Sequence, residues 1–129
     1  MYVNGADDSA VTSTINAKLS QDKSIDWVMT LGAQYALDAA KGAKSANSNA
    51  KIATFDTNKD LVNAIKDGTV QWAVDQQPYL QGYLAVTQLY LYKKNGNILG
   101  GGKPSLTGPA FVDTSNVDSI LPFINQNTR

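Results

Sequence analysis

Polar residues follow directly after three short apolar segments of this chain, at positions 30–32, 56–58 and 75–77. Asp56 and Gln76 stand out among them, because a carboxylate accepts hydrogen bonds and a planar amide both donates and accepts them. Together they can fix the orientation of a hydroxyl group, which is itself both donor and acceptor. These residue types therefore favour recognition of a hydroxylated molecule over covalent chemistry.

The composition argues against several other kinds of chemistry. Cysteine and histidine are both absent, which removes thiol nucleophiles, Cys or His zinc sites and the commonest general base. The sequence contains no GxSxG motif, no carboxylate pair at a useful spacing and no cluster of metal ligands. The charges of the 11 basic and 11 acidic side chains cancel, so the net charge gives no indication of electrostatic binding to nucleic acid. We expect no enzyme, no cofactor, no metal site and no nucleic-acid partner.

Strands and helices alternate along the chain. Strands are expected at residues 2–4, 25–30, 51–55, 70–75 and 106–112, and helices from residue 7 and at 33–45, 59–67, 79–94 and 115–125. Val11, Ile15 and Leu19 recur every four residues and predict the buried stripe of the first helix. The alternation predicts a parallel sheet covered on both faces, whose strand ends line one edge where ligands usually bind.

Each candidate residue also has a purely structural interpretation. Asp56 could cap the helix that begins at residue 59, and Gln76 could hydrogen-bond nearby backbone. Asp75 is as well suited to a salt link or a brace as to ligand contact. Trp27 and Trp72 could stack on a ligand, but both lie inside predicted strands, away from the strand ends, so we expect them to pack in the core.

Several segments together resemble a known family. Residues 54–56 (TFD), followed by a helix that ends at residues 64–68 (AIKDG), resemble the strand–Asp–helix–DG unit of type I periplasmic binding proteins. Residues 72–83 (WAVDQQPYLQGY) resemble the hinge and following helix of their sugar-binding branch, and residues 101–113 (GGKPSLTGPAFVD) resemble that branch too. The similarity extends from about residue 2 to residue 113.

The resemblance implies one α/β lobe of a periplasmic or extracellular receptor that delivers a monosaccharide to an ABC permease. The expected fold is an incomplete three-layer sandwich around a parallel sheet, of the flavodoxin-like periplasmic-binding-protein type. The residues that match ligand contacts are Asp56 and Gln76, with Asp75, Thr30 and Gly32 beside them. Relatives often carry asparagine in the loop at residues 30–32, so a side-chain contact is expected to be lost at Gly32.

The resemblance also implies that residues 1–129 form a single C-terminal-lobe fragment, without the N-terminal lobe and the first strand and helix of its own lobe. We therefore expect the isolated chain to bind sugar weakly or not at all. The hinge is expected near residues 75–78, and the helix at 79–94 normally packs on the absent lobe. Since that helix is apolar on nearly every side, we expect it either to fold back onto its own sheet or to pair with a second copy in a homodimer.

Two other classes of function share this fold type. The effector-binding domain of a LacI-type transcription regulator is the alternative, and its discriminating feature is a basic helix-turn-helix upstream, which this chain does not contain. An enzyme of flavodoxin-like or hydrolase type would have to rely on Asp, Glu, Lys, Ser or Tyr, and no pattern of these residues favours it.

Overall fold

The computed structural model describes residues 7–129. The elements are α1 Asp8–Gln21, β1 Trp27–Thr30, α2 Ala33–Ser45, β2 Lys51–Phe55, α3 Lys59–Lys66, β3 Trp72–Asp75, α4 Pro78–Asn95, the short 3-10 helix η1 Leu99–Gly102, β4 Ala110–Asp113 and α5 Val117–Asn125. This alternation confirms the predicted α/β class. The strand predicted at residues 2–4 lies outside the described residues.

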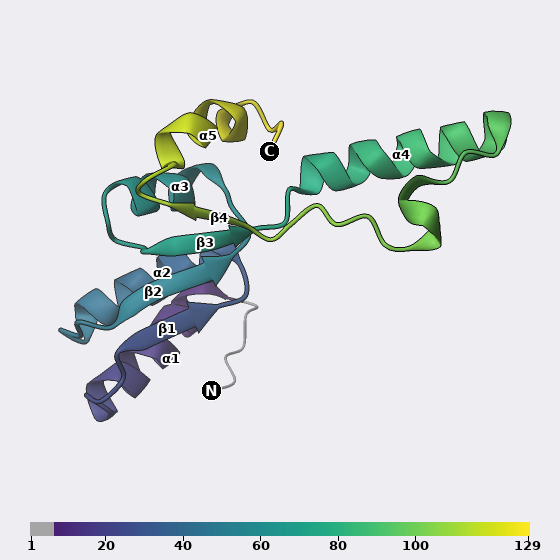
Figure 1. Cartoon of the computed structure of the whole chain (residues 1–129). Coiled ribbons are helices and arrows are strands. Elements are labelled where there is room, and N and C mark those ends of the chain that lie inside the picture. The colour runs from purple at the N-terminus through teal and green to yellow at the C-terminus, as the bar shows by residue number, and fades with distance from the viewer. Residues whose placement is uncertain (1–6) are drawn as a thin grey trace.

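The four described strands form one sheet in the order β1-β2-β3-β4 (Figure 1). β1, β2 and β3 are parallel, as predicted, with Thr30 beside Thr54 and Phe55 beside Val74. β4 is the exception and runs antiparallel to β3. After β3 the chain leaves the sheet through α4 and comes back to the end of the sheet that it left. Such a return gives an antiparallel neighbour, because a parallel one needs a crossover to the opposite end.

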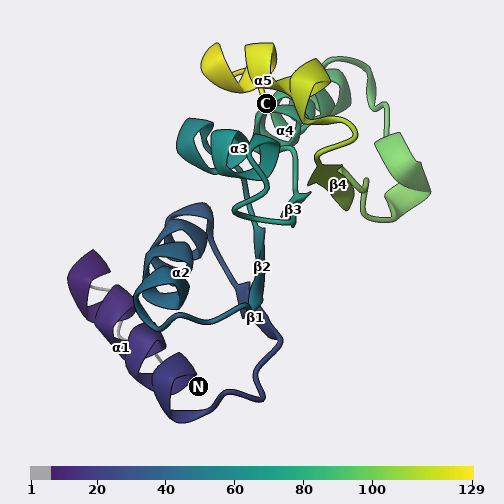
Figure 2. The same ribbon diagram turned by 90° about the vertical axis from the view of Figure 1, so that its left-hand side faces the viewer.

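One hydrophobic core lies between the sheet and the helices α1, α2, α3 and α5. The predicted stripe of Val11, Ile15 and Leu19 is buried in it, and Ile52 and Val112 face it from the sheet. Figure 2 shows α1, α2 and α3 together on one side of the strands. The described residues therefore provide the sheet and one helical layer of the expected sandwich.

Helices α1 and α2 are in close contact at Gly42, which is buried. A Cβ atom on Gly42 would lie 2.9 Å from the carbonyl oxygen of Thr12 and 3.2 Å from the backbone nitrogen of Asn16. Both atoms belong to the backbone of α1, which cannot move aside as the tip of a side chain can. The contact between the two helices therefore depends on the absence of a side chain at this position.

The opposite side of the sheet is mostly apolar and is covered by none of the described helices (Figure 2). We call it the open sheet face; its large apolar side chains, one or two per strand, are Trp27, Met29, Phe55, Trp72 and Phe111, and Lys51 and Asp113 lie on the same face. Trp27 is 49% exposed and Phe111 is 57% exposed, while Trp72 packs edge-on against Phe111 at 5.7 Å between ring centroids. The prediction that Trp27 packs in the core is therefore wrong, because alternation along β1 directs it away from the side that the helices cover.

Helix α4 extends away from the sheet as an arm, and the chain returns beside it toward β4 (Figure 1). None of its residues is buried. Pro78 occupies the first turn and Gly96, at φ 72°, ends the helix, both as predicted. The expectation that α4 folds back onto its own sheet is wrong, which leaves its apolar surface without a partner among the described residues.

Three aspartates outside the candidate ligand residues accept hydrogen bonds from groups two positions further along the chain. The pKa of Asp113 is lowered from its ordinary 3.8, because the hydroxyl and the backbone N–H of Ser115 donate to the carboxylate. The pKa of Asp22 is lowered in the same way by the hydroxyl and N–H of Ser24. Asp67 shows the same direction of shift.

These shifts predict a loss of stability in acid. A carboxyl whose folded pKa lies below its unfolded pKa stabilises the fold above the unfolded value, and this contribution is lost as the pH falls through the folded pKa. We expect the free energy of unfolding, measured with urea, to decrease between about pH 5 and about pH 3. Asp113→Asn should make this decrease smaller, and Asp60→Asn, on the exposed side of α3, serves as the matched control. Equal pH profiles for the wild type and Asp113→Asn would contradict this account.

Candidate functional site

The predicted polar residues after β2 and β3 meet at one edge of the sheet. The side-chain amide of Gln76 donates a hydrogen bond to Oδ1 of Asp56, with 2.5 Å between Nε2 and Oδ1. The backbone N–H of Asp56 donates to the carbonyl oxygen of Val74 at 2.9 Å, which extends the pairing of β2 and β3 by one residue. The carboxyl ends of two adjacent parallel strands thus place a carboxylate and an amide in direct contact, at the edge where open α/β sheets usually bind ligands.

Asp56 adopts a left-handed backbone conformation with φ 64°. Few residues other than glycine do so, and asparagine and aspartate are the commonest exceptions. The cap of α3 is Asn58, whose side chain accepts from the backbone N–H of Leu61 at 2.8 Å. The interpretation of Asp56 as the cap of this helix is therefore wrong, and its carboxylate is available for other contacts.

Gln76 does not use its side chain to hold nearby backbone. Among the described residues, its only side-chain hydrogen bond is the one to Asp56, and the residue is exposed. The second N–H of the amide and its carbonyl oxygen therefore have no partner among residues 7–129. A hydroxylated molecule at this edge could use both groups.

Asp75 has the contacts of a brace. Its side chain is fully buried at the end of β3, Oδ2 accepts from Nε of Arg129 at 2.8 Å, and Oδ1 accepts from the backbone N–H of Gln77 at 2.8 Å. Both carboxylate oxygens are thus engaged by the chain itself, and ligand contact by Asp75 stays a prediction. Arg129 was missed in the sequence, because no local signal relates it to a residue 54 positions earlier.

Thr30 and Gly32 stabilise the edge next to β1. The hydroxyl of Thr30 is buried and donates to the hydroxyl of Thr54 at 2.7 Å, and that hydroxyl in turn lies 3.0 Å from the carbonyl oxygen of Gly32. Gly32 begins α2 without a capping side chain. In this arrangement Thr30 positions the loop from inside, and direct ligand contact by Thr30 and Gly32 stays a prediction.

The arm is joined to the sheet at a junction formed by residues 75–78 and 107–109. Gln77, at φ 57°, donates from its side-chain amide to the carbonyl oxygen of Thr107, and the Thr107 hydroxyl donates to the carbonyl oxygen of Gln76 at 2.9 Å. A Cβ atom on Gly108 would lie 3.1 Å from the carbonyl oxygen of Asp75, so the two segments cross in close contact. The candidate ligand residues therefore lie directly beside the junction.

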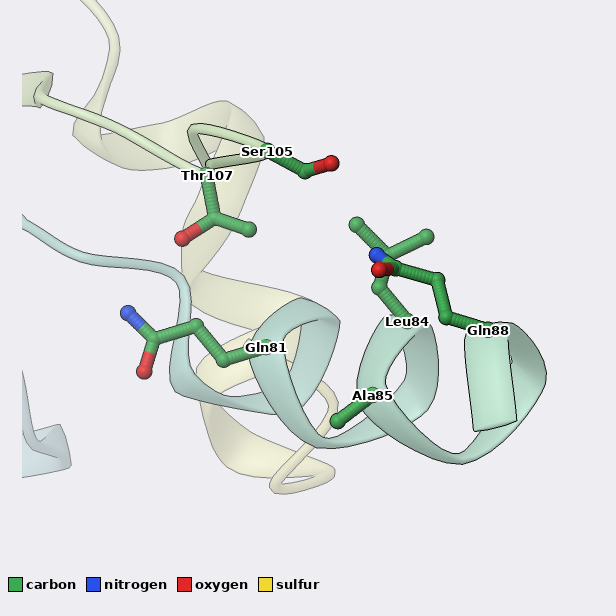
Figure 3. A pocket seen from close by; sticks show the side chains of 6 residues that line it. All are labelled: Gln81, Leu84, Ala85, Gln88, Ser105 and Thr107. Atoms are coloured by element: carbon green, nitrogen blue, oxygen red, sulfur yellow. The ribbon is translucent and has the colours of Figure 1, made fainter. Parts of the chain in front are cut away.

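A second hollow lies on the arm, next to the Asp56–Gln76 edge, since Gln81 and Thr107 of its lining both donate to the backbone carbonyl oxygen of Gln76. It is an open groove of about 330 Å³ between α4 and the returning segment (Figure 3), lined by Gln81, Leu84, Ala85, Gln88, Ser105 and Thr107. Within residues 7–129, no group of three or more Asp or Glu residues is placed to hold a metal ion. The helices of this part of the chain also include none that is long and apolar enough to cross a membrane.

Comparison with curated and solved proteins places this geometry in context. The xylose/arabinose-binding protein XylF of Sulfolobus acidocaldarius is 32% identical over 82 residues, which is 62% of this chain and 20% of that protein. A carbohydrate transporter of Acidothermus cellulolyticus 11B, crystallised in complex with myo-inositol, is 54% identical with a TM-score of 0.93, and the match covers 100% of this chain and 45% of the other. A myo-inositol binding protein of Caulobacter shares the fold at 22% identity and a TM-score of 0.74, over 92% of this chain and 40% of the other.

This chain therefore spans less than half of the solved structures that it matches. The profile of the family described as "Periplasmic binding protein domain" matches residues 2–97, which is well over half of the chain. The profile match and the shared fold agree with the resemblance of residues 54–56 and 72–83. The chain belongs to the periplasmic binding protein family.

Proposed function

We propose that the Asp56–Gln76 edge is half of a binding site for a monosaccharide or a cyclic polyol, in an extracytoplasmic binding protein that serves an ABC importer. The observation that carries this proposal is the direct contact of the two side chains at the strand ends. Asp56 does not cap a helix, and the second N–H and the carbonyl oxygen of the Gln76 side-chain amide lack partners within residues 7–129. The edge thus presents acceptors and a donor in the combination that neighbouring sugar hydroxyls require.

Selectivity in such a site comes from the cost of leaving polar groups unpaired. A ligand without a hydroxyl in the right place would leave the carboxylate or the amide unsatisfied, which costs about 1–3 kcal/mol per group once the site closes. Gly32 offers no side-chain contact at the neighbouring loop. Within this half of the site, the ligand is therefore recognised mainly by Asp56 and Gln76. Within residues 7–129 we assign no residue a catalytic role.

The relatives indicate the chemical class of the ligand. One is a xylose/arabinose-binding protein, and the structure at 54% identity holds myo-inositol. Pentoses, hexoses and inositol all present adjacent hydroxyls on a six-membered or five-membered ring. None of the relatives named here is described as a transcription regulator, so the comparisons do not favour a LacI-type effector domain.

In the longer relatives, more than half of the chain has no counterpart in residues 1–129. We therefore interpret residues 1–129 as a C-terminal lobe, residues 75–78 as part of a hinge, and α4 as the helix that would pack on a second lobe. That lobe would close the site from the other side. The 129-residue chain alone should then bind sugar with a dissociation constant on the order of millimolar or weaker, because half of the polar contacts are missing.

The test is a titration of the isotope-labelled chain with xylose, arabinose, ribose, glucose and myo-inositol, followed by NMR. We expect at least one of these ligands to shift the backbone signals of residues 56–58 and 75–77. Asp56→Ala should weaken that ligand about tenfold or more, since a carboxylate hydrogen bond to a hydroxyl is lost. Asp60→Ala, on the neighbouring helix turn, should leave the shifts unchanged.

Three results would contradict the proposal. Shifts confined to the groove of residues 81–88 would place the ligand on the arm instead of the strand edge. Equal losses for Asp56→Ala and Asp60→Ala would remove the specific role of Asp56. Micromolar affinity of the isolated chain would contradict the interpretation of the edge as half of a site.

A further inference from the structure

The side chain of Gln76 points toward Asp56, although few contacts hold the side chain itself. Gln76 is exposed, and among residues 7–129 its amide makes one hydrogen bond, to Oδ1 of Asp56. An exposed glutamine normally samples several rotamers, and the rotamers open to it depend on its backbone dihedral angles. The direction of the amide therefore depends on what fixes the backbone of residues 75–77.

The backbone of residues 76 and 77 is held on both sides. The carbonyl oxygen of Gln76 accepts from Nε2 of Gln81 at 3.0 Å and from the hydroxyl of Thr107 at 2.9 Å. The backbone N–H of Gln77 donates to Oδ1 of Asp75 at 2.8 Å. Gln77 has φ 57° and ψ 60°, a left-handed conformation that is unfavourable for a residue with a side chain and persists only where its surroundings impose it. The hydrogen bonds of the junction impose it here.

Asp75 can hold Gln77 only while its carboxylate keeps one orientation. The side chain of Asp75 is fully buried, and its Oδ2 accepts from Nε of Arg129 at 2.8 Å. A hydrogen bond between two charged groups is short and strong, so the guanidinium fixes the rotation of the carboxylate and with it the position of Oδ1. Arg129 thus acts on the backbone next to Gln76 through Asp75.

The end of α5 brings Arg129 to this position. The backbone N–H of Thr128 donates to the carbonyl oxygen of Phe123 at 2.9 Å. The backbone N–H of Asn127, a residue at φ 55°, donates to the carbonyl oxygen of Ile124 at 3.1 Å. These two bonds around a left-handed residue form a Schellman motif, which turns the chain out of a helix. Ile124 is part of the core, so α5 is anchored, and Figures 1 and 2 both show the end of the chain beside the start of α4.

We propose that Asp75 and Arg129 are positioning residues of the binding site. Without touching the ligand, they hold the backbone of residues 76 and 77 in the conformation that directs the Gln76 amide toward Asp56. If this support is lost, the side chain spreads over the three staggered positions of its first torsion, and about one third of the molecules stay competent. The dissociation constant of the ligand should then rise about threefold. The inference rests on the proposed function only for this effect on binding, because Gln76 is oriented without a ligand.

The first measurement needs no ligand. In NMR spectra of the isotope-labelled 129-residue chain, the side-chain amide signal of Gln76 reports its hydrogen bond, and Asp56→Ala gives the position of the free amide. Arg129→Ala should move the signal most of the way to that position. Arg129→Lys should recover the wild-type position, since the contact with Asp75 uses a single nitrogen atom.

Two further variants separate positioning from a general loss of stability. Gly42→Ala crowds the backbone of α1 with a Cβ atom 2.9 Å from the carbonyl oxygen of Thr12, outside the junction, and should leave the Gln76 signal in place. Asp75→Asn keeps an acceptor for Gln77 but lacks the ion pair, so it should move the signal in the same direction as Arg129→Ala. It decides the question if Arg129→Ala does not fold, which the dispersion of the backbone signals shows.

Titration with myo-inositol measures the effect on binding. Arg129→Ala should raise the dissociation constant about threefold, while Arg129→Lys and Gly42→Ala should stay at the wild-type value. An unchanged Gln76 signal in folded Arg129→Ala and Asp75→Asn, or an equal displacement in Gly42→Ala, would overturn the inference. Loss of binding in Asp75→Asn with the Gln76 signal in place would make Asp75 a ligand contact instead. If the wild type bound none of the five ligands proposed above while the signal moved as expected, the positioning role would stand and the proposed function would be contradicted.

Discussion

Removing the side chain of Arg129 should lower the free energy of unfolding by about 2–3 kcal/mol, although Arg129 is the last residue of the chain. Its Nε donates to Oδ2 of Asp75, whose side chain is completely buried. Without the guanidinium, this carboxylate loses its only countercharge among the described residues, and a buried charge without a partner is costly. We reduce the expected loss below that of a fully buried pair, because the Arg129 side chain is 27% exposed. Urea unfolding of Arg129→Ala measures the effect.

A double-mutant cycle separates the pair from other effects. Asp75→Asn keeps the shape and the acceptor for the backbone N–H of Gln77, so adding Arg129→Ala to it should cost much less than Arg129→Ala alone. Lys66→Ala is the control, since Lys66 pairs with Asp118 at 2.6 Å on the surface, where removal should cost less than about 1 kcal/mol. If Arg129→Ala and Lys66→Ala lowered the free energy of unfolding equally, the burial of Asp75 would not strengthen its ion pair with Arg129.

Replacing Gly42 with alanine should lower the free energy of unfolding by about 1–3 kcal/mol. Alanine normally stabilises a helix relative to glycine. A decrease in the free energy of unfolding, instead of an increase, would therefore itself indicate a close contact at Gly42. The new Cβ would lie 2.9 Å from the carbonyl oxygen of Thr12, which belongs to the backbone of α1. Relieving that contact requires α1 and α2 to separate, and the core residues between them, such as Ile15, would lose packing.

The control for Gly42 lies on the arm. Gly82→Ala introduces the same atom in the middle of α4, where nothing lies within 4 Å of the position that it would occupy. This variant should show equal or greater helix content by circular dichroism and no loss of stability. A stabilising effect of Gly42→Ala would mean that α1 and α2 adjust freely, and would contradict the close contact described above.

Most of the local structure follows from short-range patterns. The stripe of Val11, Ile15 and Leu19 requires only that a helix with one apolar side bury it. Pro78 at the start of α4 and Gly68, at φ 82°, after α3 have conformational preferences that act within a few residues. The contact of Asp56 with Gln76 could be anticipated for a related reason: parallel strands end at the same edge, so residues that follow adjacent strands come together.

The tertiary structure alone decided the features that depend on distant parts of the chain. The antiparallel direction of β4 depends on how the chain returns from the arm, and the brace of Asp75 depends on Arg129, 54 residues later. Trp27 is a residue type that often lies in the core, but which face of a strand is covered depends on the whole sheet. From residue types and spacing alone, the sequence determined the polar pair at the strand ends and its suitability for hydroxyl groups. The fold decided that Asp56 is free of capping while Asp75 is bound, because burial and hydrogen-bond partners arise only when distant segments pack together.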